Sequence, residues 1–68
     1  MNNKVKIQRA IKNVTQAQLS EIIGVSRQTI NAVEKNKYVP STVLALKLAK
    51  FFQIPVEELF ELGDDDLS

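Results

Sequence analysis

The sequence has no cysteine, histidine or tryptophan, and only two glycines and two prolines among its 68 residues. Without cysteine, disulfides, thiolate chemistry and zinc-finger ligation are excluded. Without histidine, the chain lacks the usual general base and the only side chain whose ordinary pKa lies near neutrality. Six of its eight acidic residues cluster towards the C-terminal end, without histidine or cysteine near them. We therefore expect no enzyme activity, no metal site and no cofactor.

Long hydrophobic runs are also missing, and the longest uncharged apolar stretch falls far short of the about 20 residues that span a membrane. No secretion signal precedes the first expected helix. The composition, 44% hydrophobic and 25% charged, is ordinary for a globular protein. A chain this short supports one small core. We expect a single cytoplasmic domain over residues 1–62, followed by an acidic tail over residues 63–68.

The net charge of +1 hides a division along the chain. All nine Lys and Arg residues lie between Lys4 and Lys50, where only Glu21 and Glu34 oppose them, so this segment carries +7. From Ile54 onward the chain has six acidic residues and no basic one, a local charge of −6. Attraction to phosphate depends on local basic patches rather than on the total. The small net charge is therefore compatible with a nucleic-acid partner.

Apolar residues at helical spacing predict five helices. The first, from Val5 to Asn13, has an apolar face with Ile7, Ala10, Ile11 and Val14 and a basic face with Lys6, Arg9 and Lys12. The fourth, from Thr42 to Phe52 after a loop that ends at Pro40, is apolar almost all round and should be the buried centre. The fifth opens at Pro55, with Glu57 and Glu58 favouring its first turn. The core residues that we predict from the last two helices are Leu44, Leu48, Phe51, Val56, Leu59 and Phe60.

The second and third helices form a closely joined pair within residues 15–33. Thr15 and Gln18 have the spacing of a capping box, and the stripe of Leu19, Ile22 and Ile23 follows. Gly24 supplies the left-handed backbone that ends a helix, and Ser26 can cap the next one. Ile30 and Val33 then lie three apart on one side. This spacing is typical of two crossed helices joined by a short turn.

The side of the third helix opposite Ile30 and Val33 is polar and free of acids. At 100° per residue it carries Gln28, Asn31, Ala32 and Lys35, with Arg27 beside them. Arg can bridge guanine O6 and N7, Gln or Asn can pair with adenine N6 and N7, and Ala can touch a thymine methyl. Taken alone such residues indicate an ordinary solvated face, but their place in a helix pair favours DNA reading. We predict that the helix over 27–35 enters the major groove and contacts bases through Arg27, Gln28, Asn31 and Ala32.

Residues that carry a family resemblance extend along nearly the whole chain. They are Thr15-Gln16 with Leu19, Gly24-Val25-Ser26, Ile30, Glu34, the loop to Pro40, LALKLAKFF and IPVEELF. With them the sequence resembles the Cro/CI-type helix-turn-helix family, also called the XRE family, of phage repressors and small bacterial transcriptional regulators. The resemblance implies an all-α, lambda-repressor-like five-helix bundle and regulation of transcription. It also implies that Gln16 bridges the DNA backbone and the reading helix.

Glu34 is an unusual residue for a helix that approaches phosphates. Its angular position puts it on the flank of the packed side, and we predict a structural ion pair with Arg9 of the first helix; an exposed pair of negligible effect is the alternative. The resemblance implies the same pair and a phosphate contact by the arginine. The phosphate contacts that we predict are Arg9, Gln16, Ser26, Lys35, Asn36 and Lys37.

One reading helix offers few base contacts, which predicts a homodimer on a pseudo-palindromic double-stranded DNA operator. Apolar groups at the two ends, Phe60, Leu62 and the residues near Val5, are the expected dimer surface, where small relatives pair their termini as strands. A repressor is expected rather than an activator, since no second domain is evident. The alternative function is a protein-interaction adaptor, or an antitoxin-type DNA-binding subunit that acts with a partner protein.

Overall fold

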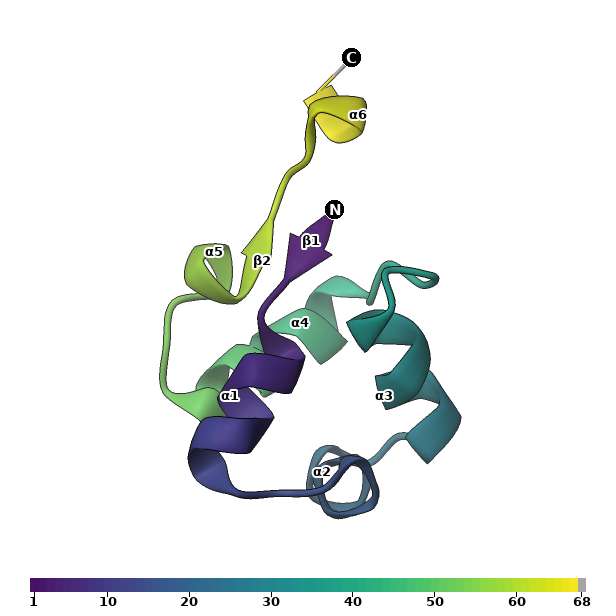
Figure 1. Cartoon of the computed structure of the whole chain (residues 1–68), viewed down its shortest axis with the longest axis vertical. Coiled ribbons are helices and arrows are strands. Elements are labelled where there is room, and N and C mark those ends of the chain that lie inside the picture. Colours follow the sequence, from purple (N-terminus) through teal and green to yellow (C-terminus); the bar gives the residue numbers. More distant parts are fainter. Residues whose placement is uncertain (68) are drawn as a thin grey trace.

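The structure is a computed structural model that describes residues 1–67 and is predominantly helical, with its ends joined by a small ribbon (Figure 1). In chain order the elements are β1 (Asn2–Asn3), α1 (Val5–Lys12), α2 (Gln16–Ile23), α3 (Arg27–Glu34), α4 (Thr42–Phe52), α5 (Val56–Leu59), β2 (Phe60–Glu61) and α6 (Asp64–Leu67). The expected all-α bundle is confirmed, with the ribbon and α6 as additions. Ser68, the last residue of the predicted tail, lies outside the described residues. None of the helices within residues 1–67 is long and apolar enough to cross a membrane.

Helix boundaries follow from local capping. The Thr15 hydroxyl accepts from the Gln18 amide at 3.0 Å, and the Gln18 side chain accepts from the Thr15 amide at 2.9 Å, which completes the predicted capping box. Gly24 ends α2 with a φ of 88°, a conformation that costs glycine little. Ser26 and Ser41 cap α3 and α4 through their hydroxyls. The chain therefore sets these helix starts and stops locally, as its sequence predicts.

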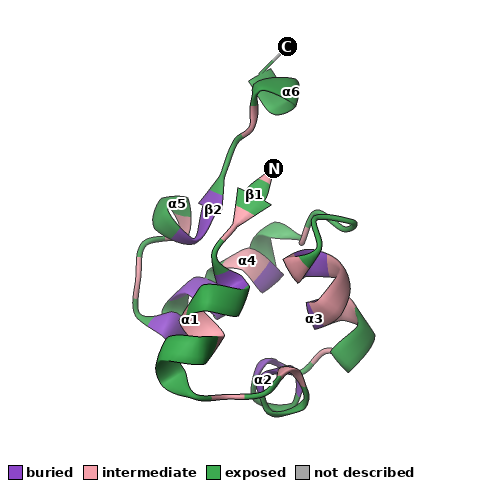
Figure 2. Ribbon diagram, in the orientation of Figure 1, coloured by how far each residue is buried: buried purple, intermediate pink, exposed green. Residues whose placement is uncertain are grey.

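The core is centred on α4 and is closed by side chains from α1, α2, α3 and α5 (Figure 2). Its fully buried large side chains are Leu19, Ile30, Leu48, Leu59, Val5 and Val33. The prediction is confirmed for Leu44, Leu48, Leu59 and Phe60, which are buried, and Val56 packs against the core while partly buried. Phe51, like Val56, packs against the core while partly buried. The buried ring is that of Phe52, and Phe51 lies edge-on to it under Lys12, whose ammonium sits 5.2 Å from the Phe51 ring centre.

The first helix turns a different face inward from the one that its apolar residues predict. Ile7 is 57% exposed and Ile11 70% exposed, and Ala10 is exposed as well. The inward side carries fully buried Val5 and, one turn further, half-buried Arg9. Arg9 must face the bundle to reach Glu34, and that requirement rotates the apolar stripe outward. The stripe of α2 is likewise narrower than expected, because Ile22 is 55% exposed.

The two ends of the chain pair with each other. Asn2 lies opposite Glu61 and Asn3 opposite Phe60 in an antiparallel ribbon, and the Lys4 amide donates to the Leu59 carbonyl at 2.9 Å. Val5 and Phe60, which we expected at the surface between two subunits, are buried within one chain. The expectation that they remain free for a dimer is therefore wrong, since pairing within the chain covers both. Leu62 remains exposed.

Candidate nucleic-acid interface

The α2–α3 unit presents a fixed surface because its inner side is locked into the core. Leu19 and Ile23 of α2 and Ile30 and Val33 of α3 are all buried. Ser20 of α2 is small and buried, and its hydroxyl donates to the Ala17 carbonyl at 2.7 Å. Packing of this kind holds both helices as one rigid body. The orientation of the outer side chains is therefore set by the fold.

The outer side of α3 carries the predicted base-reading residues. Arg27 and Gln28 are exposed, and Asn31 and Ala32 are half-buried on the same side. No acidic side chain is found among these positions. Gln16, Arg27, Gln28 and Asn31 together line a cleft of about 280 Å³ between the start of α2 and α3. The structure thus brings residues from both helices to one concave polar site.

A broader groove of about 660 Å³ adjoins this cleft and shares Gln16 and Arg27 with it. Arg9 lines it from α1, and the start of α2 contributes its first residues. Helix N-termini bind anions because their first N–H groups have no partner within the helix. The groove therefore combines two guanidinium groups with unpaired backbone donors. Beyond it, Ser26, Lys35, Asn36 and Lys37 are exposed around the ends of α3.

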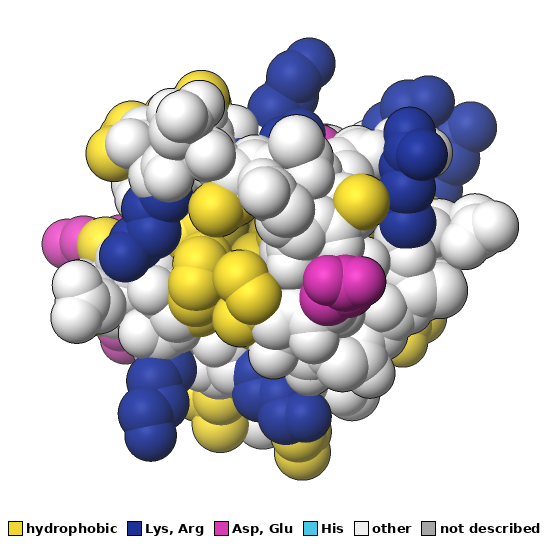
Figure 3. Space-filling model, turned by 90° about the horizontal axis from the view of Figure 1, so that it is seen from below, with side chains coloured by type: hydrophobic (Ala, Val, Ile, Leu, Met, Phe, Trp, Pro, Cys, Tyr) yellow, Lys and Arg dark blue, Asp and Glu magenta, His cyan; other side chains and the backbone are white. Residues whose placement is uncertain are grey.

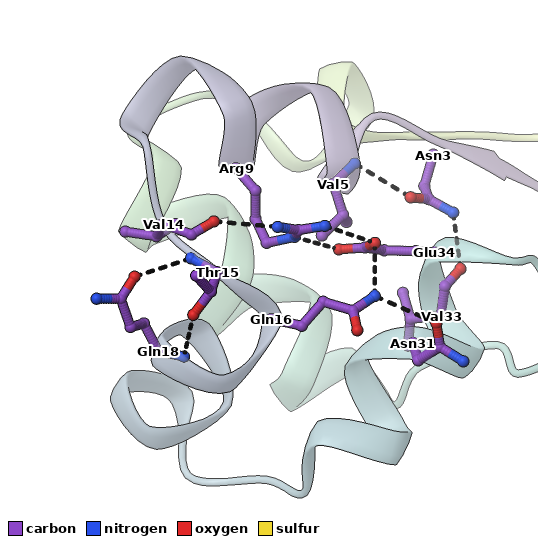
Figure 4. Close-up of polar contacts among 10 residues, drawn as sticks. All are labelled: Asn3, Val5, Arg9, Val14, Thr15, Gln16, Gln18, Asn31, Val33 and Glu34. Carbon is purple, nitrogen blue, oxygen red and sulfur yellow. Dashed lines mark hydrogen bonds and ion pairs between the residues drawn. The ribbon is translucent and has the colours of Figure 1, made fainter.

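Arg9 and Glu34 form a two-pronged ion pair between α1 and the end of α3 (Figure 4). Arg9 Nε donates to Glu34 Oε2 at 2.6 Å and Nη2 donates to Oε1 at 3.1 Å. Nη1 also donates to the Val14 carbonyl at 3.0 Å, which ties in the segment between α1 and α2. The side chains are only 16% and 5% exposed, respectively. The pair is therefore a structural connection across the bundle and not a solvated surface contact.

Both pKa values reflect this pairing. Burial by itself raises the pKa of Glu34, but hydrogen bonds from Arg9 and Gln16, with the charges of Arg9 and Lys6, outweigh it and lower that pKa below its ordinary value. The hydrogen bond to Glu34 raises the pKa of Arg9 despite its burial. Glu34 is thus ionised at neutral pH and accepts hydrogen bonds only.

Gln16 links the first residue of α2 to α3 through a single nitrogen. Its Nε2 donates to Glu34 Oε1 at 3.0 Å and to Asn31 Oδ1 at 3.2 Å (Figure 4). The two N–H groups of that amide nitrogen are thereby both engaged. The link from Gln16 to α3, one half of the bridge that the family resemblance implies, is present.

Sequence reasoning missed Asn3, which positions the far end of α3. Its Nδ2 donates to the Val33 carbonyl and to Asn36 Oδ1, each at 2.8 Å, and its Oδ1 accepts from the Val5 amide at 3.1 Å. Asn3 therefore connects β1, the start of α1 and the loop after α3. An asparagine before a short strand gives no sequence signal for such a contact, because its partners lie 30 or more residues away.

Charge is separated along the 35 Å long axis of the molecule. The acidic helix α6 lies at the opposite end from α2, and α5 and β2, which carry the other C-terminal acids, lie between them (Figure 1). Viewed from the α2 end, Lys and Arg side chains surround the molecule and apolar side chains gather beside the centre (Figure 3). Within residues 1–67 no group of three or more Asp, Glu, His or Cys residues is placed to hold a metal ion. The acidic end therefore does not cover the α2–α3 surface.

The profile of the helix-turn-helix family matches residues 5–59, which is most of the chain. The chain therefore belongs to the helix-turn-helix family of DNA-binding transcriptional regulators, which are not enzymes. The recognition made from the sequence motifs is confirmed.

Individual relatives agree with this assignment. The chain is 53% identical over 66 residues to an uncharacterized HTH-type transcriptional regulator of Methanocaldococcus jannaschii, covering 97% of this chain and 100% of that one. It is 47% identical over 66 residues to the uncharacterized HTH-type transcriptional regulator YgzD of Bacillus subtilis, with the same coverage. Among solved structures, the restriction-modification controller protein C.AhdI of Aeromonas hydrophila matches with a TM-score of 0.76 and 32% identity, over 84% of this chain and 86% of that one.

Proposed function

We propose that this regulator reads double-stranded DNA by sequence, with α3 in the major groove. The observation that carries the proposal is the acid-free outer side of α3, which continues into a concave polar surface lined by Gln16, Arg27, Gln28 and Asn31. A helix of this width fits the major groove, where each base pair presents its own pattern of donors and acceptors. The base contacts are assigned to Arg27, Gln28, Asn31 and Ala32.

Phosphate contacts flank α3 on both sides in this proposal. On one side Arg9 has two of its five N–H groups beyond the three that bind Glu34 and Val14, and the backbone of Gln16 adds a helix N-terminus. On the other side lie Lys35, Asn36 and Lys37, with Ser26 at the start of α3. Such contacts fix the orientation of a protein on the duplex and leave the sequence to be read by base contacts.

Affinity supports a homodimer on a pseudo-palindromic operator. About three base contacts at about 1 to 3 kcal/mol each fall short of the roughly 11 to 15 kcal/mol of a specific operator complex. A two-fold dimer doubles the contacts and matches two half-sites about 34 Å apart. We assign the dimer surface to an apolar hollow of about 310 Å³ whose lining includes Val39, Pro40 and Leu46. Exposed Val43 and Leu62 add apolar surface, and Val39 and Pro40 place it just beyond the end of α3.

Replacing Leu46 by aspartate should shift the dimer to monomer at concentrations where the parent is dimeric, because a carboxylate in an apolar interface is desolvated without a partner. Sedimentation equilibrium measures the change. The matched control is Ile22→Asp, since Ile22 is 55% exposed against 53% for Leu46 and lies on α2, outside the hollow. A dimer that survives Leu46→Asp unchanged would remove this surface from the proposal.

The proposed mode of action is repression in the cytoplasm. A domain seated in the major groove of a promoter excludes other proteins from the same DNA, and it needs no contact with polymerase to do so. The acidic helix α6 lies at the opposite end of the molecule from α2 (Figure 1), so DNA binding through the α2–α3 surface leaves α6 outside the complex.

Selection from a randomised duplex library, followed by fluorescence-anisotropy titration, tests the proposal. We expect one enriched two-fold symmetric motif, preferred over a shuffled duplex, with affinity that falls steeply as salt rises because phosphate contacts release counterions. Equal, weak binding to every duplex with no enriched motif would instead favour the adaptor or partner-dependent antitoxin function.

Two single substitutions should separate the residues that read bases from those that contact phosphates. Gln28→Ala should remove discrimination at one or two base pairs, about 1 to 3 kcal/mol, while non-specific affinity is nearly kept. Lys37→Ala should weaken all sequences alike and reduce the salt slope by about 1. Competition titrations with the selected duplex and its single-base variants measure both effects. An equal loss on every sequence from Gln28→Ala would contradict its assignment as a base contact.

A further inference from the structure

The side chains of Arg9, Glu34, Gln16 and Asn31 are hydrogen-bonded in that order. Each one decides whether the next side chain meets it with a donor or with an acceptor. Arg9 has only donors and ionised Glu34 has only acceptors. Gln16 can therefore face Glu34 only with its amide nitrogen, at 3.0 Å from Glu34 Oε1. The carboxylate thus sets the orientation of the Gln16 amide, which a glutamine alone leaves open.

The same nitrogen then sets the orientation of Asn31. Its second N–H points to Asn31 at 3.2 Å, so the atom of Asn31 that meets it must be the acceptor Oδ1. The Nδ2 of Asn31 is directed away from Gln16 (Figure 4). Among residues 1–67 no hydrogen bond to this nitrogen is formed, and no buried polar side-chain atom lacks a partner, so Nδ2 faces solvent. Asn31 therefore offers two N–H donors to the cleft that it lines with Arg27 and Gln28.

We propose that Asn31 is a donor-only specificity residue that selects guanine or thymine and rejects cytosine at one position of each half-site. The inference rests on the proposed function and adds that, in one base contact, Asn31 donates and the base accepts. In the major groove guanine presents the acceptors N7 and O6 and thymine presents O4, whereas cytosine presents the N4 donor. Two N–H donors match the first two edges and oppose the third.

The usual pairing of asparagine with adenine is disfavoured by the same geometry. That pairing needs the oxygen and the nitrogen of the amide together, one for N6–H and one for N7. Here Oδ1 is turned inward to Gln16. Adenine can then form one bond through N7, with its N6 donor unmatched. Guanine accepts two hydrogen bonds, so it exceeds adenine by one net bond, which corresponds to about a fivefold difference in affinity.

The test compares base preferences in the selected operator for the full chain and three variants. Asn31→Asp keeps the shape but presents an acceptor outward, so cytosine should change from the least to the most preferred base at one position. Gln16→Met removes the donor that holds Asn31, so adenine should gain about fivefold relative to guanine at that same position. Gln8→Met, the same substitution on half-buried Gln8 of α1, should leave every preference unchanged. Relative preferences are used because a lost phosphate contact weakens all sequences alike.

The outcomes separate the inference from the proposed function. An enriched motif in which both Asn31→Asp and Gln16→Met leave every base preference intact overturns this inference alone, and so does a motif position controlled by Asn31 at which adenine is preferred. A library that yields no enriched motif overturns the proposed function and the inference together. Without DNA, nitrogen-resolved NMR should show slowed solvent exchange for the side-chain amide protons of Gln16 and fast exchange for those of Asn31; the reverse order contradicts the arrangement of the amides.

Discussion

The Arg9→Met variant should lose about 3 kcal/mol of unfolding free energy, because it leaves Glu34 as a buried charge without a cation. Glu34 is 5% exposed, and of its two donors only Gln16 would remain. Methionine keeps the apolar stem of the arginine, so the loss reports the charge and its hydrogen bonds rather than a cavity. Urea denaturation followed by circular dichroism measures this loss of unfolding free energy. The measurement is made without DNA because Arg9 is also assigned to a phosphate contact.

The matched control for this pair is Lys4→Met. Lys4 and Glu61 lie 3.7 Å apart with side chains 50% and 54% exposed, and exposed pairs contribute about 0 to 1 kcal/mol. We expect Lys4→Met to change the free energy of unfolding little. Equal, small losses from Arg9→Met and Lys4→Met would show that the Arg9–Glu34 contact stabilises no more than a surface pair.

The same pair predicts how stability depends on pH. The pKa of Glu34 is lowered by folding, so its contribution is complete above the unfolded carboxyl pKa of about 4.3 and is lost as the pH falls through the lower folded value. In Arg9→Met the main hydrogen bonds that lower this pKa are gone. The stability difference between parent and variant should therefore be largest at neutral pH and shrink on acidification below about pH 4. A difference that stays constant to strongly acidic pH would contradict this linkage.

Ile30→Ala should cost about 2 to 5 kcal/mol, since it opens a cavity where α3 packs on the core. Ile30 is fully buried on the inner side of the α2–α3 unit. For a domain of this size such a loss is a large share of the total stability. Thermal and urea unfolding should both show this loss of stability. At urea concentrations where the variant is still folded, its α3 should remain helical because alanine favours the helix.

Ile11→Ala is the control of the same chemistry on another helix. Ile11 is 70% exposed on α1, so its truncation removes little buried area, and the higher helix propensity of alanine should keep stability within a few tenths of a kcal/mol of the parent or raise it. A loss comparable to that of Ile30→Ala would mean that the apolar stripe of α1 is covered in solution.

The features that the sequence predicts well are those decided within a few residues. The capping box at Thr15, the left-handed Gly24 and the serine caps depend on neighbours in the chain, and each lies where it was expected. The inward positions of Ile30 and Val33 follow from their spacing within one helix. The candidate site follows for the same reason, because the polar side of α3 is the complement of its buried side.

The features that the sequence did not predict depend on partners far away in the chain. On α1 the apolar stripe at Ile7 and Ile11 favoured one rotation of the helix, but the ion pair of Arg9 with Glu34 requires another. On α4, Phe52 continues the four-residue spacing of Leu44 and Leu48 and is buried, whereas the predicted Phe51 is only partly buried against the core. The orientation of the Asn31 amide needs three side chains from three helices, and no local pattern encodes it.

The ribbon between β1 and β2 also bears on how the chain folds as it is made. Asn3 pairs with Phe60, and the Lys4 amide donates to the Leu59 carbonyl, so these contacts cannot form until residues 59 and 60 have been synthesised. Translation proceeds at about 5 to 20 residues per second, and α2 and α3 emerge from the ribosome well before β2. Such long-range pairing is a late event on entropic grounds. The α2–α3 unit is therefore synthesised before the ribbon that joins β1 to β2 can form.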